Sequence, residues 1–290
     1  MQNSINYIQQ QQFNKNNILT IQNIRDYPLS EITKISTFHA NSTFIGGDTI
    51  TGRVLSRYIM YLNSKDVSLT PHLSMSGYWE IGNTQLIARL INEGGYCVDA
   101  GANCGYFALL MVDIVGKTGK VAAVEANPNL CALIEKSANV NGYKNRLSVV
   151  NKALGSMVGK SVQLVIDQEN LGSASLYHSK AENNFSVEVE TTTIDELTKG
   201  WPRVDFVKID IEAAEYETWK GMKKTLKNNK HIVILMEVSM ERNYDCMNFL
   251  EEIKLEGFKL MHVNSEGNME PVALENPSNF PSYWDLILIR

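Results

Sequence analysis

The chain has 290 residues, of which 44% are hydrophobic and 20% charged, and its formal net charge is −5. These values lie near those of average soluble globular proteins and exclude disordered, collagen-like and coiled-coil chains. The weakly acidic balance gives no electrostatic footprint for nucleic acid or an anionic membrane. The four cysteines stand far apart without metal-ligand spacing, and no apolar run is long enough to span a bilayer. We therefore expect a soluble, cytoplasmic protein with reduced cysteines, no membrane span, no nucleic-acid partner and no metal.

The first third of the chain differs in character from the rest. Twelve of the first 23 residues are Asn or Gln, which leaves too little apolar surface to offset the entropy of ordering. Residues 1–23 are therefore predicted to be a flexible tract, and residues 24–94 a helical extension. Within that extension, the segment 52–62 has its apolar residues at helical spacing and predicts an amphipathic helix. A second helix is predicted over 84–92, just before a Gly-Gly pair.

From residue 95 onward, strands alternate with helices, which is the pattern of a parallel sheet in an α/β domain. Helices are predicted over 106–115, 128–140, 214–226 and 244–255, and two further strands at 160–167 and 186–193. The strands of the main sheet are predicted at 96–101, 121–126, 147–151, 204–211, 231–238, 257–263 and 283–290. No helix separates the last two of these strands, so the final strand should pair antiparallel. The sequence thus predicts one domain over 95–290 with a sheet of about seven strands.

The loop after the first of these strands carries a glycine pattern. Asp99 is followed by Gly101, Asn103 and Gly105, just before the predicted helix. Small residues let the backbone approach a ligand closely. The dinucleotide fingerprint needs glycine at its first, third and sixth positions, which are here Gly101, Asn103 and Tyr106. The loop therefore favours a nucleoside ligand without a diphosphate.

Acidic residues follow other strands at the same edge of the sheet, where open parallel sheets bind their ligands. Glu125 ends the second strand, where an acid can accept both ribose hydroxyls of a nucleoside. Asp210, Glu212 and Glu215 follow the fourth strand, and Glu237 lies near the end of the fifth. For each acid, a structural role as a helix cap or a strand-end hydrogen-bonding group stays open as the competing interpretation.

An ordered set of sequence strings adds a family resemblance. The strings are SGYWE, VDAGANCGYFALL, AVEANPNL, NKALG, LGSAS, TTTIDEL, VDFVKIDIEAAEYETWKGM and IVILMEV. Over about residues 75–290 the chain resembles the FkbM family of S-adenosylmethionine-dependent methyltransferases. The resemblance implies the class I methyltransferase fold, a Rossmann-like seven-strand sheet with an antiparallel last strand, and S-adenosylmethionine as cofactor. It also implies O-methylation of a hydroxyl on a sugar, glycan or natural-product intermediate.

The resemblance also implies which residues bind the cofactor. Asp99 matches the acid beside its methionine part, Glu125 the acid on its ribose, and residues 151–153 lie where its adenine is expected. The full predicted set is Glu80, Asp99, Gly101, Ala102, Asn103, Gly105, Tyr106, Phe107, Glu125, Ala126, Asn127, Lys152, Ala153 and Asp210. Two residues depart from the family pattern: Ala126 stands where proline is usual, and Ala213 stands where glycine is usual.

The predicted mechanism follows from the cofactor, whose methyl group is already activated by a positively charged sulfur. The enzyme then mainly aligns the acceptor, and a carboxylate with a raised pKa takes the hydroxyl proton. His178 is the alternative base. The rings of Trp79, Tyr106 and Phe107 can face the sulfonium, although Phe107 is expected rather to pack in the core. The predicted catalytic acids are Asp210, Glu212 and Glu215.

Two other classes of function stay open at this point. One is an NAD-dependent oxidoreductase, against which the glycine loop argues, and the other is a non-catalytic binding protein with a methyltransferase fold. The N-terminal extension is predicted to be a lid over the acceptor pocket, with Tyr78, Trp79 and Glu80 at its junction with the domain. The oligomeric state, including a homo-oligomer, stays open as well.

Overall fold

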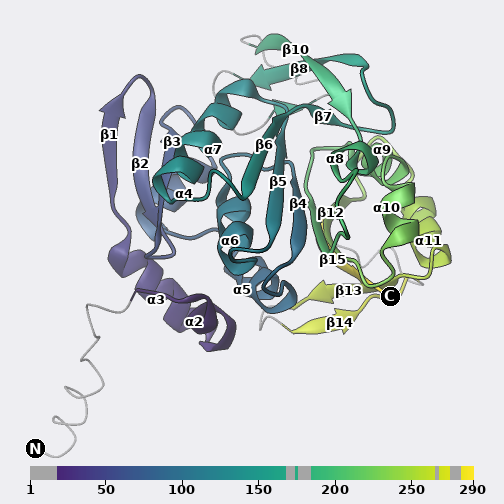
Figure 1. The fold of residues 1–290 in the computed structure, drawn as a ribbon, viewed down its shortest axis with the longest axis horizontal. Helices are drawn as coiled ribbons and strands as arrows, with labels where there is room; N and C mark the ends of the chain where they lie inside the picture. The colour runs from purple at the N-terminus through teal and green to yellow at the C-terminus, as the bar shows by residue number, and fades with distance from the viewer. Residues whose placement is uncertain (1–17, 168–173, 176–183, 265–267, 275–281) are drawn as a thin grey trace, which may run out of the picture.

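The centre of the molecule is an eight-stranded mixed sheet (Figure 1). The computed structural model describes residues 18–167, 174–175, 184–264, 268–274 and 282–290. The strand order is β14-β13-β15-β12-β11-β4-β5-β6, and β15 runs antiparallel to both of its neighbours. This confirms the predicted seven-strand sheet with a reversed last strand, to which the short β14 is added. The strands are β4 (Tyr96–Ala100), β5 (Lys120–Glu125), β6 (Leu147–Asn151), β11 (Phe206–Ile209), β12 (Val233–Ser239), β13 (Lys259–Val263), β14 (Met269–Pro271) and β15 (Tyr283–Ile289).

Helices cover both faces of this sheet, because its central strands carry apolar side chains on each side (Figure 1). In β4, Cys97 packs into the core under α6, whereas Val98 and Ala100 pack into the core on the opposite face. One face is covered by α5 (Ile81–Leu90), α6 (Tyr106–Ile114) and α7 (Pro128–Val140). The other is covered by α8 (Ile194–Leu197), α9 (Glu215–Lys220), α10 (Lys223–Asn228) and α11 (Cys246–Leu255). The helix predicted over 214–226 is thus two short helices.

The N-terminal extension corrects one prediction. It contains α2 (Ile21–Asp26), α3 (Leu29–His39) and α4 (Leu69–Ser76), but the segment 52–62 is not a helix. It forms most of a hairpin within a three-stranded antiparallel sheet of β1 (Ser42–Gly46), β2 (Thr49–Val54) and β3 (Tyr58–Asn63). Burial along β3 alternates with a period of two, and the inter-strand turn places Leu55 and Ser56 at φ 47° and 55°. Neither residue is a usual one for such a turn, so the sequence carries no hairpin signal there.

The small sheet is attached to the α/β domain through α7. The Ile59 amide donates to Asn141 Oδ1 at 3.1 Å and the Tyr61 amide to Ser137 Oγ at 2.9 Å. The Asn141 side-chain amide returns a hydrogen bond to the Ile59 carbonyl at 2.7 Å. These side chains satisfy backbone groups along the edge of β3, so the extension is held against the domain.

The prediction of a flexible tract over 1–23 is wrong for its last residues. Leu19 is only 1% exposed, its amide donates to Ser56 Oγ at 2.8 Å, and its carbonyl accepts from Arg57 at 2.7 Å. The buried Leu19 and Ile24 supply the apolar anchor that the Asn- and Gln-rich composition conceals. Residues 1–17 lie outside the described part of the chain.

A second small sheet follows β6 and lies over the ligand edge of the main sheet (Figure 1). Its order is β7-β10-β8-β9, with β8 and β10 paired antiparallel. The two extra strands predicted at 160–167 and 186–193 are therefore confirmed. The strands are β7 (Ala153–Leu154), β8 (Ser161–Asp167), β9 (Ala174–Ser175) and β10 (Asn184–Thr192).

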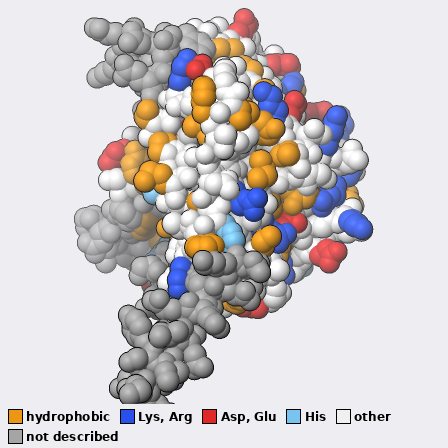
Figure 2. Space-filling view, turned by 90° about the vertical axis from the view of Figure 1, so that its left-hand side faces the viewer, with side chains coloured by type: hydrophobic (Ala, Val, Ile, Leu, Met, Phe, Trp, Pro, Cys, Tyr) orange, Lys and Arg blue, Asp and Glu red, His pale blue; other side chains and the backbone are white. Residues whose placement is uncertain are grey.

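Figure 2 looks onto the side of the molecule that carries the N-terminal sheet. Hydrophobic side chains are scattered over this face in small groups between polar ones. The exposed large hydrophobic residues of the extension include Phe38, Phe44 and Ile45. Among the described residues, no helix has the length and apolar character needed to cross a membrane.

Candidate functional site

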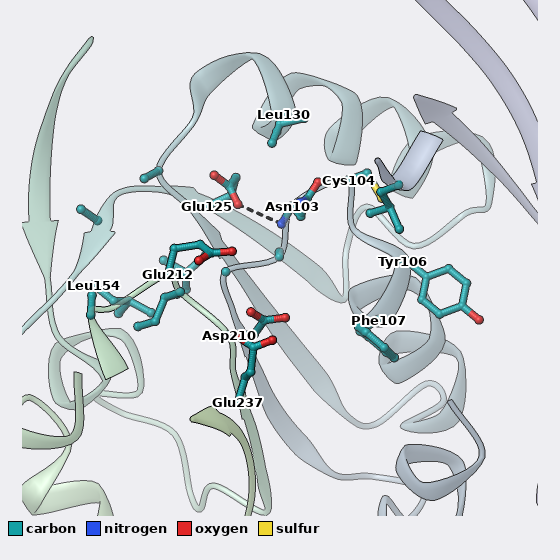
Figure 3. Close-up of a pocket in the computed structure, with 18 of the residues that line it drawn as sticks. Asn103, Cys104, Tyr106, Phe107, Glu125, Leu130, Leu154, Asp210, Glu212 and Glu237 are labelled. Carbon is teal, nitrogen blue, oxygen red and sulfur yellow. Dashed lines mark hydrogen bonds between the residues drawn. The ribbon is translucent and has the colours of Figure 1, made fainter. Parts of the chain in front are cut away.

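A cavity of about 380 Å³ lies at the carboxyl ends of β4, β5, β11 and β12 (Figure 3). This is the edge where an open parallel sheet binds ligands. The N-terminal extension adds wall residues from the start of α4 and from the segment before α5. The predicted site residues that line the cavity are Glu80, Gly101, Ala102, Asn103, Tyr106, Phe107, Glu125, Ala126, Lys152, Ala153, Asp210 and Glu212.

The glycine loop brings bare backbone to the cavity. Gly101, Asn103 and Gly105 have φ angles of 82°, 50° and 86°, which only glycine, and to a lesser degree asparagine, adopts readily. A Cβ on Gly101 would lie 1.9 Å from the carbonyl oxygen of Asp210. A Cβ on Gly105 would press on Ile134 of α7. Gly101 thus lets the loops after β4 and β11 touch, whereas Gly105 serves packing behind the cavity wall.

We expect Gly101→Ala to destabilise the fold by about 3 kcal/mol or more, the sum of an overpacking cost and a left-handed backbone cost. Gly142→Ala is the matched control, because Gly142 has φ 77° but nothing within 4 Å of the added Cβ. The control should show only the backbone cost of about 1–2 kcal/mol. Urea unfolding of both variants decides, and equal losses of stability would contradict the close approach at Gly101.

Glu125 ends β5 with its carboxylate at the cavity wall and its position fixed by backbone amides (Figure 3). Oε2 accepts from the Asn103 amide at 2.9 Å, and Oε1 accepts from the Asn127 amide at 2.8 Å. Burial raises the pKa of Glu125 to about 7, although these two amides act in the opposite direction. Each oxygen has a second lone pair, so the carboxylate can accept two hydroxyls from a ligand. Asn127 itself caps α7, with Pro128 next to it, and lies behind the wall.

A buried lysine that the sequence analysis missed lies beneath the cavity. Lys208 Nζ donates to Asp210 Oδ2 at 2.7 Å and lies 4.8 Å from the centre of the Phe107 ring. Its β11 position is in register with Asp99 of β4. Burial alone would lower the pKa of Lys208, but Asp210, Asp99 and Glu80 outweigh it and raise that pKa. An apolar strand with one lysine offers no sequence signal beyond the alternation that places Lys208 and Asp210 on one face.

The resemblance implied that Asp99 lies beside the methionine part of the cofactor. In the structure Asp99 lies behind the cavity wall. The residue is 1% exposed, and neither carboxylate oxygen has a hydrogen bond of good geometry among the described residues. Burial raises the pKa of Asp99 to about 6, partly offset by Lys208 and by the Ala108 amide. Asp99 lies two residues before Gly101, inside β4 and away from the cavity. It is therefore next to Lys208 of the neighbouring strand β11 and does not face the cavity.

The loop after β11 carries strained backbone. Glu212 and Ala213 have φ angles of 41° and 75°, in the left-handed region. The Glu212 carboxylate lines the cavity and accepts from Arg242 Nη1 at 2.6 Å. Alanine thus takes, at position 213, a left-handed conformation that glycine adopts more readily.

Ala213→Gly is therefore expected to stabilise the protein by about 1 kcal/mol, because it relieves the cost of a left-handed Cβ. Ala214→Gly makes a matched control, since Ala214 has an ordinary φ of −103° and is 3% exposed. It gains no relief of strain and should lose about 0.8 kcal/mol with its buried methyl group. Urea unfolding measures both changes. A loss of stability in Ala213→Gly would show that the left-handed conformation is not strained.

Glu215 is a structural residue, which corrects its prediction as a catalytic acid. It is fully buried at the start of α9, where Oε1 accepts from the Ala213 amide at 3.1 Å and Oε2 from the Tyr244 hydroxyl at 3.2 Å. It is not among the described residues that line the cavity. Glu215 starts α9, and its side chain points into the protein interior. There it holds the preceding loop through the hydrogen bond from the Ala213 amide.

Glu237, which the sequence analysis placed at the same edge but not among the catalytic acids, lies beside Asp210 (Figure 3). Ile209 of β11 is in register with Met236 of β12, so the following residues, Asp210 and Glu237, are neighbours. Burial, and then the charge of Asp210, raise the pKa of Glu237 to about 8, although Arg242 opposes the shift. Arg242 Nη2 donates to Glu237 at 2.8 Å. Two adjacent carboxylates, one with a pKa near 8, form a group that can hold a proton at neutral pH.

The extension completes the cavity. Ser68, Leu69, Trp79 and Glu80 line it, and the carboxylate of Glu80 accepts from Asn83 Nδ2 at 2.9 Å. The extension therefore supplies part of the cavity wall. Tyr106 lies at the cavity edge, and its hydroxyl is 3.0 Å from Thr84 Oγ1.

Two other predictions concern His178 and a metal. The alternative base His178 lies outside the described residues. Within the described part of the chain, no group of three or more His, Cys, Asp or Glu side chains is arranged to hold a metal ion.

Comparisons with known proteins relate this geometry to a family. The model of the methyltransferase FkbM domain matches residues 99–260, more than half of the chain. Protein-L-isoaspartate O-methyltransferases 1 and 2 of Archaeoglobus fulgidus are 35% and 36% identical over 60 and 55 residues. These matches cover 21% and 19% of this chain and 28% and 25% of the relatives, so the chain spans about a quarter of their length.

Two solved structures are also similar at low sequence identity. The methyltransferase FkbM of Methylobacillus flagellatus is 12% identical, with 69% of this chain and 45% of that chain covered and a TM-score of 0.45. The O-methyltransferase of Bacillus cereus in complex with SAH (S-adenosylhomocysteine) is 13% identical, with 79% and 84% covered and a TM-score of 0.42. The matched family region of this chain runs from Asp99 through the glycine loop, Glu125, Asp210 and Glu237. The protein therefore belongs to the FkbM family of S-adenosylmethionine-dependent methyltransferases.

Proposed function

We propose that the protein methylates a hydroxyl oxygen on a sugar, glycan unit or natural-product intermediate. The observation that carries this proposal is the carboxylate pair of Asp210 and Glu237, which lies in the same cavity as Glu125 but away from it (Figure 3). A hydroxyl acceptor has a proton to lose, and this pair provides a place for it. An amine or thiol acceptor has less need of such a base.

The residues around the glycine loop fit the cofactor. Gly101 offers backbone without a side chain, and Glu125 offers two fixed oxygens for the ribose hydroxyls. Leu130 and Leu154 add apolar walls suited to a flat base. When bound, S-adenosylmethionine supplies a methyl group on a positively charged sulfur.

The chain's own residues then align the acceptor and manage its proton. Lys208 fixes Asp210 through a hydrogen bond of 2.7 Å, and Arg242 fixes Glu237 through one of 2.8 Å. Two buried or half-buried cations therefore position the two carboxylates and limit the repulsion between them. Proton transfer from the acceptor to this pair is the role that we assign to Asp210 and Glu237.

The rate of methyl transfer should depend on pH through this pair. Because the pKa of Glu237 is raised to about 8, the pair holds a proton below that pH and accepts one above it. We expect the single-turnover rate to rise about tenfold per pH unit below about pH 8 and to level off above it. In Glu237→Gln this rise should disappear. A rise that persists unchanged in the variant would assign it to another group.

The chemical nature of the product tests the proposal. S-adenosylmethionine with a ¹³C-labelled methyl group is incubated with the protein and a panel of neutral methyl glycosides, a methyl glucuronide and a methyl glucosaminide, which offer hydroxyl, carboxylate and amine acceptors. The labelled product is analysed by NMR before and after mild alkali. A methyl ether that survives alkali is expected. An alkali-labile methyl ester, which the names of the two A. fulgidus relatives would suggest, or an N-methyl product would contradict O-methylation of a hydroxyl.

We also propose that the protein acts in the cytoplasm. All four cysteines are unpaired and buried, which suits a compartment where thiols stay reduced.

A further inference from the structure

A second cavity, of about 450 Å³, lies next to the first along the ligand edge of the sheet. Three elements form it: the start of α5, the end of β13 and the start of β15. Its polar and aromatic lining residues are Glu80, Asn83, His262, Asn264, Tyr283, Trp284 and Asp285. This lining includes neither Glu125, which is proposed to bind the ribose, nor any residue of the glycine loop.

The two cavities meet at the proposed catalytic carboxylates. Glu80 lines both cavities, and Asn83 Nδ2 donates to Glu80 at 2.9 Å and to Asp285 at 2.8 Å. Asp285 of β15 is in register with Glu237 of β12, which is the neighbour of Asp210. A row of three carboxylates therefore crosses three adjacent strands, from the first cavity into the second. A ligand in the second cavity therefore lies beside Asp285, the cross-strand neighbour of Glu237.

The lining indicates the chemical class of that ligand. The carboxylates of Glu80 and Asp285 can accept hydrogen bonds from hydroxyl groups, because each keeps further lone pairs beside the hydrogen bond that it accepts from Asn83. Tyr283 is 54% exposed, and its ring is stacked by Arg242 at 5.5 Å from its centre. That ring and Trp284 offer apolar faces beside these polar groups, as in pockets that orient small molecules.

The charges in and around this cavity select against anions. No Lys or Arg is among the described lining residues, and Arg242 is engaged by Glu212 and Glu237. An anionic ligand would meet Asp285 and Glu80, and the cation that acts on both, Lys208, is buried and already bound to Asp210, so the approach of a second negative charge costs affinity. A neutral ring with several hydroxyls meets no such cost.

We infer that the second cavity is the acceptor site, and that it takes a neutral polyhydroxylated ring such as a glycosyl unit and rejects an anionic one. This inference rests on the proposed hydroxyl methylation and adds the location and charge class of the acceptor.

Binding measurements test the inference without turnover. Saturation-transfer NMR is recorded on the full chain with S-adenosylhomocysteine added, using methyl β-glucoside, methyl β-galactoside, methyl α-mannoside and methyl β-glucuronide as probes. We expect at least one neutral glycoside to bind at least about tenfold more tightly than the glucuronide. Tyr283→Ala should lower the affinity for that glycoside about threefold to tenfold. Asp285→Asn should reduce the difference in affinity between that glycoside and the glucuronide.

The control variant is Phe44→Ala, which removes another exposed aromatic ring (65% exposed) on β1, outside both cavities. Calorimetric affinity for S-adenosylhomocysteine should be unchanged in all three variants. No saturation transfer to any neutral glycoside, equal binding of the glucuronide, or glycoside affinity unaltered by both cavity substitutions would overturn the inference. Those outcomes are distinct from a failed proposed function, which would appear as an ester or N-methyl product in the ¹³C experiment.

Discussion

Asp210→Asn is expected to lower the single-turnover rate of methyl transfer by about 10²–10⁴-fold, the usual range for loss of a general base. Asparagine keeps the shape of the side chain and can still contact Lys208, which lies 2.7 Å from Asp210 Oδ2, but it cannot take up the acceptor's proton. Affinity for S-adenosylhomocysteine should be largely retained. Rapid-quench measurement at pH 8, with an acceptor identified by the labelling experiment, gives the rate.

Glu212→Gln is the matched control, because Glu212 follows Asp210 by two residues and lines the same cavity. Its carboxylate accepts from Arg242 and is half-exposed, so we expect the substitution to change acceptor binding more than the chemical step. A wild-type rate in Asp210→Asn would place the base elsewhere. Glu237 would then be the leading candidate, followed by His178.

Glu125→Ala should weaken the binding of S-adenosylhomocysteine by about ten- to a hundredfold for each ribose hydrogen bond that is lost. Hydrogen bonds to a charged group contribute roughly 1.5–3 kcal/mol each, and about 1.4 kcal/mol corresponds to a tenfold change in affinity. The effect should be large because the Asn103 and Asn127 amides hold the carboxylate in place before the ligand arrives. Isothermal titration calorimetry measures it.

In Glu125→Ala the Asn103 and Asn127 amides lose their hydrogen-bond acceptor. Part of the loss of affinity could then come from a change in the loop instead of the lost ribose contacts. Glu125→Gln addresses this, since it keeps the length and one acceptor oxygen but removes the charge, and its affinity should fall between wild type and alanine. Glu251→Ala on α11 is the surface control and should bind as wild type. Unchanged affinity in both Glu125 variants would remove this residue from the ribose site.

Much of the main sheet could be predicted from sequence because its signals are local. The buried runs of β4, β5 and β12 are flanked by turn residues, and Asn127 with Pro128 marks the start of α7. The alternation of strands and helices makes these strands parallel, which brings Glu125 and Asp210 to the same edge of the sheet. The family resemblance added the cofactor.

The hairpin of β2 and β3 could not be predicted, because its fold depends on tertiary contacts. Every residue of β3 except Asn63 is aliphatic or aromatic, and this obscures the period of two. The left-handed Leu55 is stabilised by complete burial and by the hydrogen bond that its amide donates to the Gly77 carbonyl at 2.7 Å. Neither contact is visible in a local pattern.

The acids after β11 show the same limit at the site. Three acids within six residues look equivalent in sequence, but the left-handed turn at Ala213 sends Asp210 to the cavity and Glu215 into the interior. The partners that set their chemistry, Lys208 and Arg242, come from inside one strand and from beyond another. Only the three-dimensional arrangement of the strands shows that Glu237, and not Glu215, is the neighbour of Asp210.

A crystal structure of the protein with S-adenosylhomocysteine tests the central claim most directly, namely that the first cavity holds the cofactor with its sulfur facing the carboxylate pair. We predict both ribose hydroxyls within hydrogen-bond distance of Glu125, the backbone of Gly101 against the ligand, and the sulfur on the side of Asp210 and Glu237. A ribose bound away from Glu125, or a sulfur that faces away from this pair, would contradict the account.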